Sequence, residues 1–410
     1  MPVGHAPVLL VIGSGYRPYR EYILRTAAEH FRLWLLDSQE ATWQLRHATG
    51  ATRVDTADPQ ALLAAARAVR GEIAGVFTYD ETQVTVCARI AAELGLPSSP
   101  PETIGVCRDK SATRAALAAA GIPQPGSRVV GSMEQARAAA AAIGYPVVVK
   151  ARSLAGSMGV ALARDPDALA AAYAAANDAA FPGMPRHEHG NVLVEEYLTG
   201  QEISVDAVVF DGEVMPTVLA RKHLGLDPYF EETGHDVDAA DPLLSDPVLL
   251  GQLRDIHRVL GFTYGATHTE FRLTPAGPRL IEVNARLGGD LIPYLGRLAT
   301  GTDPVLAAVR VAAGQRPDTA PRHNLAAGVR FLYPPGRCEA LDVVVHEDRL
   351  GPTVHETGVT AAPGDRLALP PEQYLCRYGH VIAVGTDREQ VGADLAAAEH
   401  VITLISRPAE

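Results

Sequence analysis

Two glutamates on neighbouring predicted strands form the strongest candidate for a chemical site in this sequence. Glu270 and Glu282 flank the turn Pro275-Ala276-Gly277, among apolar residues typical of a buried hairpin. A three-residue turn predicts that Thr274 faces Pro278, Glu270 faces Glu282 and His268 faces Asn284, all on one face. Two glutamates and the Asn284 amide suit Mg²⁺, because a cation removes the repulsion between opposed carboxylates. The alternative is a solvent-exposed hairpin that merely tolerates two like charges.

Lysine is rare in this chain. Lys110, Lys150 and Lys222 are the only lysines among 36 basic residues. A compact ammonium serves where the broad guanidinium fork does not fit, so each lysine marks a candidate site, with chance as the alternative. Lys150 follows an apolar run and precedes the small-residue loop Ser153–Val160. Such a loop beside a lysine suits a phosphate, although a plain turn between strands has a similar composition.

Two further segments have residues that suit a nucleotide. Arg286 extends the predicted hairpin face and precedes Gly288-Gly289, where the backbone can approach a ligand closely. An arginine there could hold a carboxylate or steady a phosphoryl group, unless it is one more surface arginine. The strand end Glu195–Leu198 offers backbone groups to an adenine edge, and Glu202 could accept from ribose hydroxyls. Taken singly, such glutamates are more often solvated.

The glycines near the start favour a steric function. Gly13 and Gly15 follow the apolar run Val8–Ile12, and Asp37 lies downstream as in a dinucleotide-binding fingerprint. The third glycine of that fingerprint would fall at Pro18. We therefore interpret the two glycines as a strand-to-helix turn.

The elements that must position these residues follow from hydrophobic patterns. Short apolar strands alternate with helices over the first hundred residues, which predicts a doubly wound parallel sheet. The proline-rich stretch 96–101 reads as a linker, and Asp109 as the N-cap of a helix ending at Gly121. Asp211-Gly212 predicts a hairpin turn. The polar stretch 221–241 shows little periodicity, which predicts a mobile loop.

Composition limits the class of protein. The 410 residues are 47% hydrophobic and 20% charged, with a formal charge of −12, which indicates a globular multidomain chain. No basic run favours nucleic acid, and no apolar stretch is long enough for a membrane span. The N-terminus lacks the charged region of a signal peptide. Four scattered cysteines suit reduced thiols, so we expect a cytoplasmic protein.

In order and spacing, these residues resemble the ATP-grasp superfamily over about residues 100 to 310. The resemblance implies an α/β and α+β fold: an N-terminal parallel-sheet domain, a two-lobed ATP-grasp module and a small C-terminal α+β cap. The expected domains are 1–100, 101–190 with the glycine-rich loop, 191–310 with the magnesium site, and 311–410. ATP and two Mg²⁺ ions are the implied cofactors, with Mn²⁺ as an alternative.

The resemblance assigns expected roles. Lys110 and Lys150 would contact phosphates, and Arg286 with Lys150 would be catalytic. The remaining nucleotide contacts would be Ser153, Gly156, Ser157, Met158, Gly159, Glu195, Glu196, Tyr197, Leu198 and Glu202. The metal ligands would be Glu270, Glu282 and Asn284. The substrate pocket would contain Lys222, Glu232, His235, His268, Arg286, Gly288 and Gly289.

The implied reaction is ligation of a carboxylate to an amine through an acyl phosphate, with the glycine loop and the 221–241 stretch as lids. The runs Glu282–Gly289 and Glu232–His235 look like those of L-amino-acid ligases that make dipeptides. Alternatives are a biotin carboxylase, a purine-pathway enzyme similar to glycinamide ribonucleotide synthetase, and a non-catalytic ATP-binding regulatory protein. The expected partners are a small carboxylate and a small amine, with no nucleic acid and no membrane; a homodimer is left open.

Overall fold

The computed structural model describes residues 7–181, 187 and 190–409. Its N-terminal sheet is parallel, with the order β3-β2-β1-β4, as the alternating pattern predicted. The strands are β1 (Val8–Ile12), β2 (Arg32–Asp37), β3 (Gly50–Arg53) and β4 (Ile73–Phe77). The helices are α1 (Arg17–Ala28), α2 (Pro59–Ala68) and α3 (Val84–Glu93). The short edge strand β3 was not predicted, because its residues are small, polar and partly exposed.

The glycine turn after β1 is held by the protein itself. Ser14, between Gly13 and Gly15, donates its hydroxyl to the Asp37 carboxylate at 2.7 Å. Both glycines adopt positive φ angles, which a residue with a side chain rarely does. These contacts agree with a steric function for the glycines.

A small antiparallel sheet carries Lys150 and the glycine loop. Its order is β5-β8-β6-β7. The strands are β5 (Ser127–Val130), β6 (Val147–Ala151), β7 (Val160–Ala163) and β8 (Val192–Glu196). Helices α6 (Met133–Ile143) and α7 (Pro166–Asp178) pack against this sheet, whereas α4 (Pro101–Arg108) and α5 (Lys110–Ala119) pack against each other. Asp109 caps α5 as predicted, accepting from the backbone N–H groups of Ser111 and Ala112.

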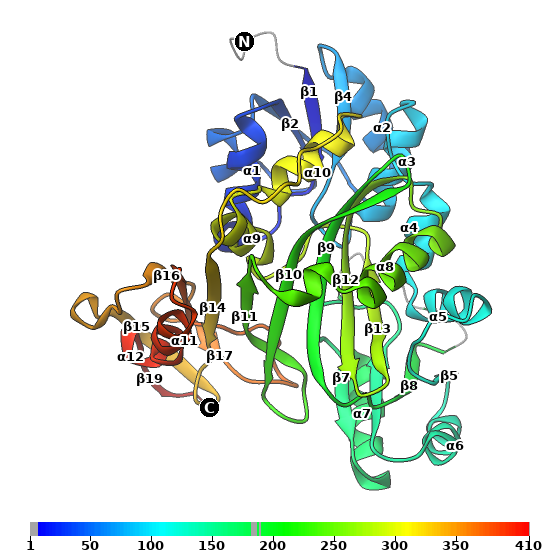
Figure 1. Ribbon diagram of the computed structural model, residues 1–410, viewed down its shortest axis with the longest axis vertical. Coiled ribbons are helices and arrows are strands. Elements are labelled where there is room, and N and C mark those ends of the chain that lie inside the picture. Colours follow the sequence, from blue (N-terminus) through cyan, green and yellow to red (C-terminus); the bar gives the residue numbers. More distant parts are fainter. Residues whose placement is uncertain (1–6, 182–186, 188–189, 410) are drawn as a thin grey trace.

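The central sheet has eight strands in the order β13-β12-β9-β10-β11-β14-β18-β16 (Figure 1). The strands before residue 300 are β9 (Gln201–Phe210), β10 (Glu213–Gly225), β11 (Glu231–Asp238), β12 (Tyr264–Thr274) and β13 (Gly277–Asn284). The adjoining helices are α8 (Pro247–Leu260), α9 (Ile292–Thr300) and α10 (Pro304–Ala312). Asp211 and Gly212 form the predicted hairpin turn between β9 and β10.

The prediction of a mobile loop over 221–241 is wrong. β10 continues to Gly225 and pairs with β11, so only residues 226–230 connect the two strands. The polar side chains of this ribbon do not all face water: Lys222 and His235 are buried. Polar residues on an inward face conceal the apolar alternation by which strands are recognised.

Helices α10 and α8 both pack against the central sheet. Residues of α10 share one hydrophobic core with the N-terminal sheet and with Val208 of β9, so the N-terminal domain packs onto the central sheet. Residues of α8 pack against β9, β12 and β13. Within this core, His257 of α8 donates Nδ1–H to the Leu253 carbonyl, and Nε2 accepts from the Thr267 hydroxyl of β12 at 2.8 Å.

The C-terminal region shares the central sheet. It contains β14 (Ala326–Leu332), β15 (Cys338–Val345), β16 (Val354–Val359), β17 (Arg366–Leu367), β18 (Gly379–Gly385), β19 (Ile402–Pro408), α11 (Arg388–Ala396) and α12 (Ala398–Val401). β14, β18 and β16 extend the central sheet, whereas β17, β15 and β19 form a separate small sheet. The mixture of helices and antiparallel strands agrees with the predicted α+β character, and the four domain boundaries stay a prediction.

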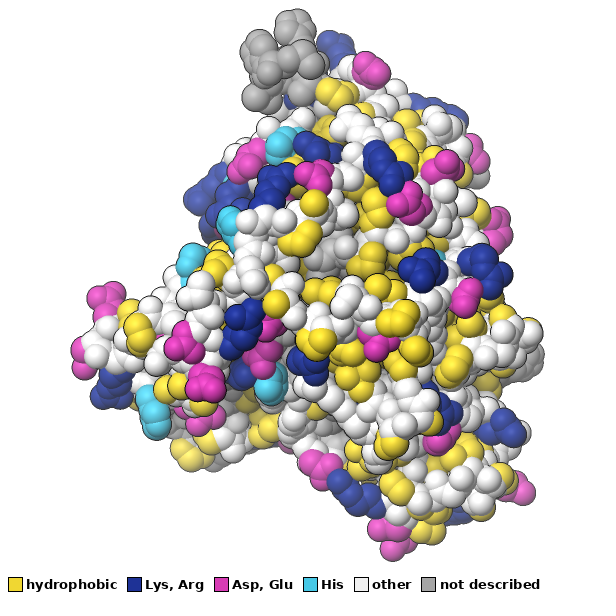
Figure 2. Space-filling model, in the orientation of Figure 1, with side chains coloured by type: hydrophobic (Ala, Val, Ile, Leu, Met, Phe, Trp, Pro, Cys, Tyr) yellow, Lys and Arg dark blue, Asp and Glu magenta, His cyan; other side chains and the backbone are white. Residues whose placement is uncertain are grey.

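The surface mixes side chains of both signs. On the face in Figure 2, basic and acidic side chains are interspersed with apolar ones. In the described part of the chain, no helix combines the length and the apolar character needed to cross a membrane.

Candidate active site

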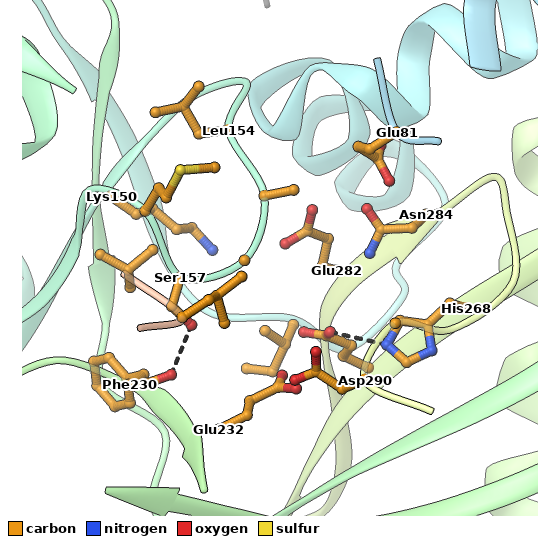
Figure 3. A pocket seen from close by; sticks show the side chains of 18 of the residues that line it. Glu81, Lys150, Leu154, Ser157, Phe230, Glu232, His268, Glu282, Asn284 and Asp290 are labelled. Atoms are coloured by element: carbon orange, nitrogen blue, oxygen red, sulfur yellow. Dashed lines mark hydrogen bonds and ion pairs between the residues drawn. The ribbon is translucent and has the colours of Figure 1, made fainter. Parts of the chain in front are cut away.

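One cavity of about 490 Å³ brings together most of the predicted site residues. Figure 3 shows Lys150 on one side and Glu282 with Asn284 on the other. The predicted residues that line it are Lys110, Lys150, Gly156, Ser157, Met158, Glu195, Glu196, Tyr197, Leu198, Glu202, Glu232, His268, Glu270, Glu282, Asn284, Arg286 and Gly289. Five others are absent from the described lining: Ser153, Gly159, Lys222, His235 and Gly288.

Lys110 and Lys150, which were predicted to contact phosphates, are both buried and have protein partners. Lys150 Nζ lies 2.5 Å from Glu195 Oε2. Lys110 Nζ donates to the Leu154 carbonyl at 2.5 Å and lies 3.0 Å from Glu282 Oε1. Burial lowers the pKa of Lys150. Burial opposes ionisation of Glu195, but Arg114 and Lys150 outweigh it and lower the pKa of that carboxyl to about 2. A buried carboxylate therefore holds Lys150 in place.

The glycine loop between β6 and β7 has two consecutive residues in the left-handed region. Gly156 and Ser157 adopt consecutive positive φ angles of 64° and 57°. Ser157 Oγ donates to the Phe230 carbonyl at 2.6 Å, which ties the loop to the β10–β11 connection. Ser153 Oγ instead contacts His187 Nε2 at 2.5 Å. Gly159 is a packing residue, since a Cβ there would lie 2.9 Å from that of Ala179.

The two glutamates of the segment Glu195–Leu198 both form ion pairs within the protein. Glu195 binds Lys150 and Arg114, and Glu196 binds Arg279 at 2.8 Å. Neither carboxylate is merely solvated. The strand ladder ends at Glu196, whose N–H donates to Gly126. Adenine binding therefore stays a prediction, for which Tyr197 and Leu198 supply the backbone beyond the ladder.

Glu202 lines the cavity and contacts two cations. Its Oε2 lies 2.8 Å from Arg272 Nη2 and its Oε1 lies 3.5 Å from Lys222 Nζ. Burial raises its pKa, and the nearby Glu270 and Glu232 carboxylates add to the rise. A carboxylate in this position can accept a hydrogen bond from a hydroxyl group. The predicted ribose contact stays a prediction.

The predicted register of the β12–β13 hairpin is right at the site and wrong at the turn. Glu270 pairs with Glu282 and His268 pairs with Asn284. Thr274 pairs with Gly277 rather than Pro278, so the turn is one residue shorter than predicted. A β-bulge restores the register, because Ile281 lies between the paired positions Leu280 and Glu282.

The hairpin has the donor set of a magnesium site. Asn284 is 5% exposed, and its Oδ1 has no hydrogen-bond partner among the described residues. A buried carbonyl oxygen without a donor is costly unless something binds it. Carboxylate and amide oxygens are the ligands that Mg²⁺ prefers. Glu270, Glu282 and Asn284 therefore fit a divalent cation, and Lys222 and Lys110 contact the two carboxylates.

Lys222 lies beneath this hairpin. Its Nζ donates to Glu232 at 2.6 Å and to Glu270 at 2.7 Å, and its side chain is fully buried. Burial opposes the charge, but the surrounding glutamates raise the pKa of Lys222 well above its usual value. Lys222 is thus the cation that holds several carboxylates together under the cavity.

His235 is buried beside Glu232 and Asp290. Its Nε2 lies 3.3 Å from Glu232 Oε2 and 3.6 Å from Asp290 Oδ2. Burial disfavours the imidazolium, but the neighbouring Asp290 and Glu232 carboxylates raise the pKa of His235. Asp290 also binds Arg377 at 2.6 Å, so this end of the cavity combines two carboxylates with two cationic partners.

Gly288 and Gly289 have separate functions. The Gly288 N–H donates to Asp206 Oδ2 at 2.9 Å, and Asp206 Oδ1 lies 2.6 Å from His268 Nδ1. A Cβ on Gly288 would lie 2.8 Å from the Asp206 carboxylate, whereas a Cβ on Gly289 would meet nothing within 4 Å. Of the two glycines, Gly289 lines the cavity, whereas Gly288 binds the Asp206 carboxylate that contacts His268.

Arg286 has a partner that the sequence did not reveal. Glu81, four residues beyond the end of β4, binds the side chains of both Arg286 and Arg108. Burial opposes ionisation of Glu81, but the two arginines lower its pKa. Asp290 and Arg377 were also missed. The position of Glu81 at the carboxyl end of a parallel strand was the one available signal; Arg377 is one arginine among many.

Two segments of the chain match known domain families. Residues 143–293 match the model of the ATP-grasp domain, and residues 330–405 match that of the L-amino acid ligase C-terminal domain 2. The uncharacterized protein y4rH of Sinorhizobium fredii is 31% identical over 344 residues, covering 82% of this chain and 69% of that protein. Carnosine synthase 1 of Gallus gallus is 29% identical over 352 residues, and the match spans 79% of this chain but only 37% of the synthase.

A solved structure has the same fold. The L-amino acid ligase from Bacillus licheniformis superimposes with a TM-score of 0.81 at 19% identity, covering 98% of this chain and 99% of that one. The chain therefore belongs to the ATP-grasp superfamily of ligases. Within that superfamily it resembles the L-amino acid ligases, whose C-terminal domain it shares.

Proposed function

We propose that the protein ligates two small amino-acid-like substrates, with ATP converted to ADP and phosphate. One oxygen of the substrate carboxylate attacks the γ-phosphorus of ATP, the bond to the β-phosphate oxygen breaks, and ADP leaves. The amine of the second substrate then attacks the acyl carbon, phosphate leaves, and the nitrogen loses a proton. The observation that carries this proposal is the placement of Lys150 and the Glu270–Glu282 hairpin on opposite sides of one cavity.

The residues would act mainly by positioning and charge neutralisation. Lys110 and Lys150 would hold phosphate oxygens, and the glycine loop would close over them and exclude water from the acyl phosphate. Glu270, Glu282 and Asn284 would hold Mg²⁺, which neutralises phosphate charge when bound. Arg286, oriented by Glu81, would steady the transferring group.

Amino-acid substrates are favoured over the other ATP-grasp reactions by the C-terminal match. Residues 330–405 resemble a domain of L-amino acid ligases, and Arg377 from this region lines the substrate end of the cavity. Acidic and basic groups alternate there, which suits a zwitterion carrying both an ammonium and a carboxylate.

Phosphate release with pairs of amino acids tests the proposal, with mass spectrometry of the product. We expect release that requires ATP, Mg²⁺ and two amino acids together, and an amide product. Release that requires bicarbonate and biotin, or a ribosylamine and glycine, would instead support the carboxylase or purine-pathway alternative. Nucleotide binding without any turnover would support the regulatory protein.

A further inference from the structure

Arg114 joins the two halves of the nucleotide site. It lies on α5 and is 7% exposed. Its Nε and Nη2 donate to the two carboxylate oxygens of Glu195 at 2.8 and 3.2 Å. Its Nη2 also donates to the backbone carbonyl of Ile281 at 2.7 Å. One guanidinium thus contacts the carboxylate that holds Lys150 and the strand that carries Glu282.

The contacted carbonyl belongs to the bulged residue. Ile281 has no partner in the β12–β13 ladder, because Leu280 pairs with Phe271 and Glu282 pairs with Glu270. The neighbouring Leu280 N–H donates to the Pro123 carbonyl at 3.0 Å, again outside the ladder. The bulge is therefore held by α5 and by the segment that follows α5.

The bulge determines where Glu282 points. Side chains alternate along a strand, so a shift of one residue would turn Glu282 to the opposite face of the hairpin. Bulges serve to re-aim a side chain near active sites. Stabilising the Ile281 carbonyl therefore stabilises the orientation of Glu282 into the cavity.

We propose that Arg114 is a positioning residue that couples the phosphate-binding lysine to the metal-binding hairpin. It fixes Glu195, and through it Lys150, at the same time as it fixes the bulge that aims Glu282. The coupling needs the fork of an arginine, because a lysine has a single nitrogen to reach Glu195 and Ile281. The inference rests on the proposed function only in taking ATP and Mg²⁺ as the ligands of the cavity.

The affinity for a non-hydrolysable ATP analogue, measured by calorimetry with and without Mg²⁺, tests the coupling. In Arg114→Lys we expect about tenfold weaker binding with Mg²⁺ and a smaller change without it, since one charged hydrogen bond is lost. The Mg²⁺ concentration needed for half-maximal enhancement of binding should rise. The charge beside Glu195 is kept, so the variant should fold.

Arg279→Lys is the matched control. Arg279 lies on β13, the strand that carries Ile281. It binds Glu196 and the Gln124 carbonyl, and neither Lys150 nor Ile281 is among its described partners. Its affinities should stay within about twofold of wild type, as expected for a partly exposed ion pair. An Arg114→Lys variant that behaves like Arg279→Lys would overturn the proposal. Equal losses with and without Mg²⁺ would also overturn it.

Two further outcomes are separated by design. If Arg114→Lys does not fold, the affinities of Arg114→Gln are measured in the same way. If neither variant folds, Arg114 is needed for folding and the proposed coupling is overturned. A wild-type protein that binds the analogue with Mg²⁺ but releases no phosphate with any substrate pair would contradict the proposed function. The affinities would still decide the role of Arg114.

Discussion

Glu270 and Glu282 lie directly opposite each other on adjacent strands, and a different lysine contacts each carboxylate. Lys222 of β10 lies 2.7 Å from Glu270, and Lys110 of α5 lies 3.0 Å from Glu282. All three lysines of the chain are buried at ion pairs of this kind. The lysines that the sequence singled out thus lie at buried ion pairs in or beside the cavity, and their roles toward a nucleotide stay a prediction.

Glu282→Gln should leave the fold intact and abolish phosphate release. The amide keeps the shape of the side chain but removes the charge that the hairpin offers to a metal ion. We expect a loss of at least about 100-fold in turnover, the usual cost of removing one electrostatic contact in a transition state. Glu213→Gln, at an exposed ion pair with Arg316, is the matched control. Turnover near wild type in Glu282→Gln would refute the metal assignment.

Lys150→Arg should be severely impaired in nucleotide binding. Lys150 is 5% exposed, and its Nζ lies 2.5 Å from Glu195, so a wider guanidinium cannot keep this geometry. The Michaelis constant for ATP, measured by phosphate release, should rise strongly. The reverse exchange Arg258→Lys on the exposed face of α8 should change nothing. A wild-type Michaelis constant in Lys150→Arg would show that the position accepts either cation.

Gly288→Ala should destabilise the protein, whereas Gly289→Ala should not. A methyl group on Gly288 would press on the Asp206 carboxylate and on His268 Nδ1, 2.8 and 3.0 Å away. Overpacking of this kind costs about 1–3 kcal/mol in the free energy of unfolding. Thermal melting of the two variants provides the comparison. Equal melting temperatures would mean that the Asp206–His268 contact yields without strain.

Stability should fall as the pH drops from 6.5 towards 4, through His257. Burial lowers the pKa of His257 from its usual 6.5 to about 4. The unfolded chain then binds a proton that the folded protein refuses, so stabilisation is complete above pH 6.5 and is lost as the pH falls to 4. His257→Gln should lack this component, so its melting temperature should approach that of wild type in acid.

The exposed His355 of β16 supplies the control for that measurement. The difference in melting temperature between wild type and His355→Gln should stay constant over the same pH range. A constant difference for His257→Gln as well would show that the buried imidazole contributes nothing to acid sensitivity.

Local patterns were enough to predict many, but not all, of the strands and helices that carry the site. Buried strands such as β1 and β6 are continuous apolar runs, and Asp109 is a standard N-cap. The opposition of Glu270 and Glu282 was predicted from a turn one residue too long, and the bulge at Ile281 compensated for that difference. A bulge depends on contacts outside the hairpin, so the hairpin sequence alone does not reveal it.

Partners from distant segments were beyond prediction. Glu81, Asp290 and Arg377 lie far apart in the sequence and meet at the cavity only after three regions of the chain have packed together. The β10–β11 ribbon was missed for a related reason. Its polar side chains are satisfied by one another inside the protein, as Lys222 and Glu232 show, and a sequence pattern does not distinguish such burial from exposure to water.

The contact between Glu81 and Arg286 makes the N-terminal region part of the cavity lining. Glu81 belongs to the first hundred residues, outside the segment 143–293 that matches the ATP-grasp domain. It nevertheless binds Arg286, which lies within that segment. A chimaera that exchanges the N-terminal region between relatives must therefore carry a matching acid at this position, or it will inherit an arginine that no longer points at its target.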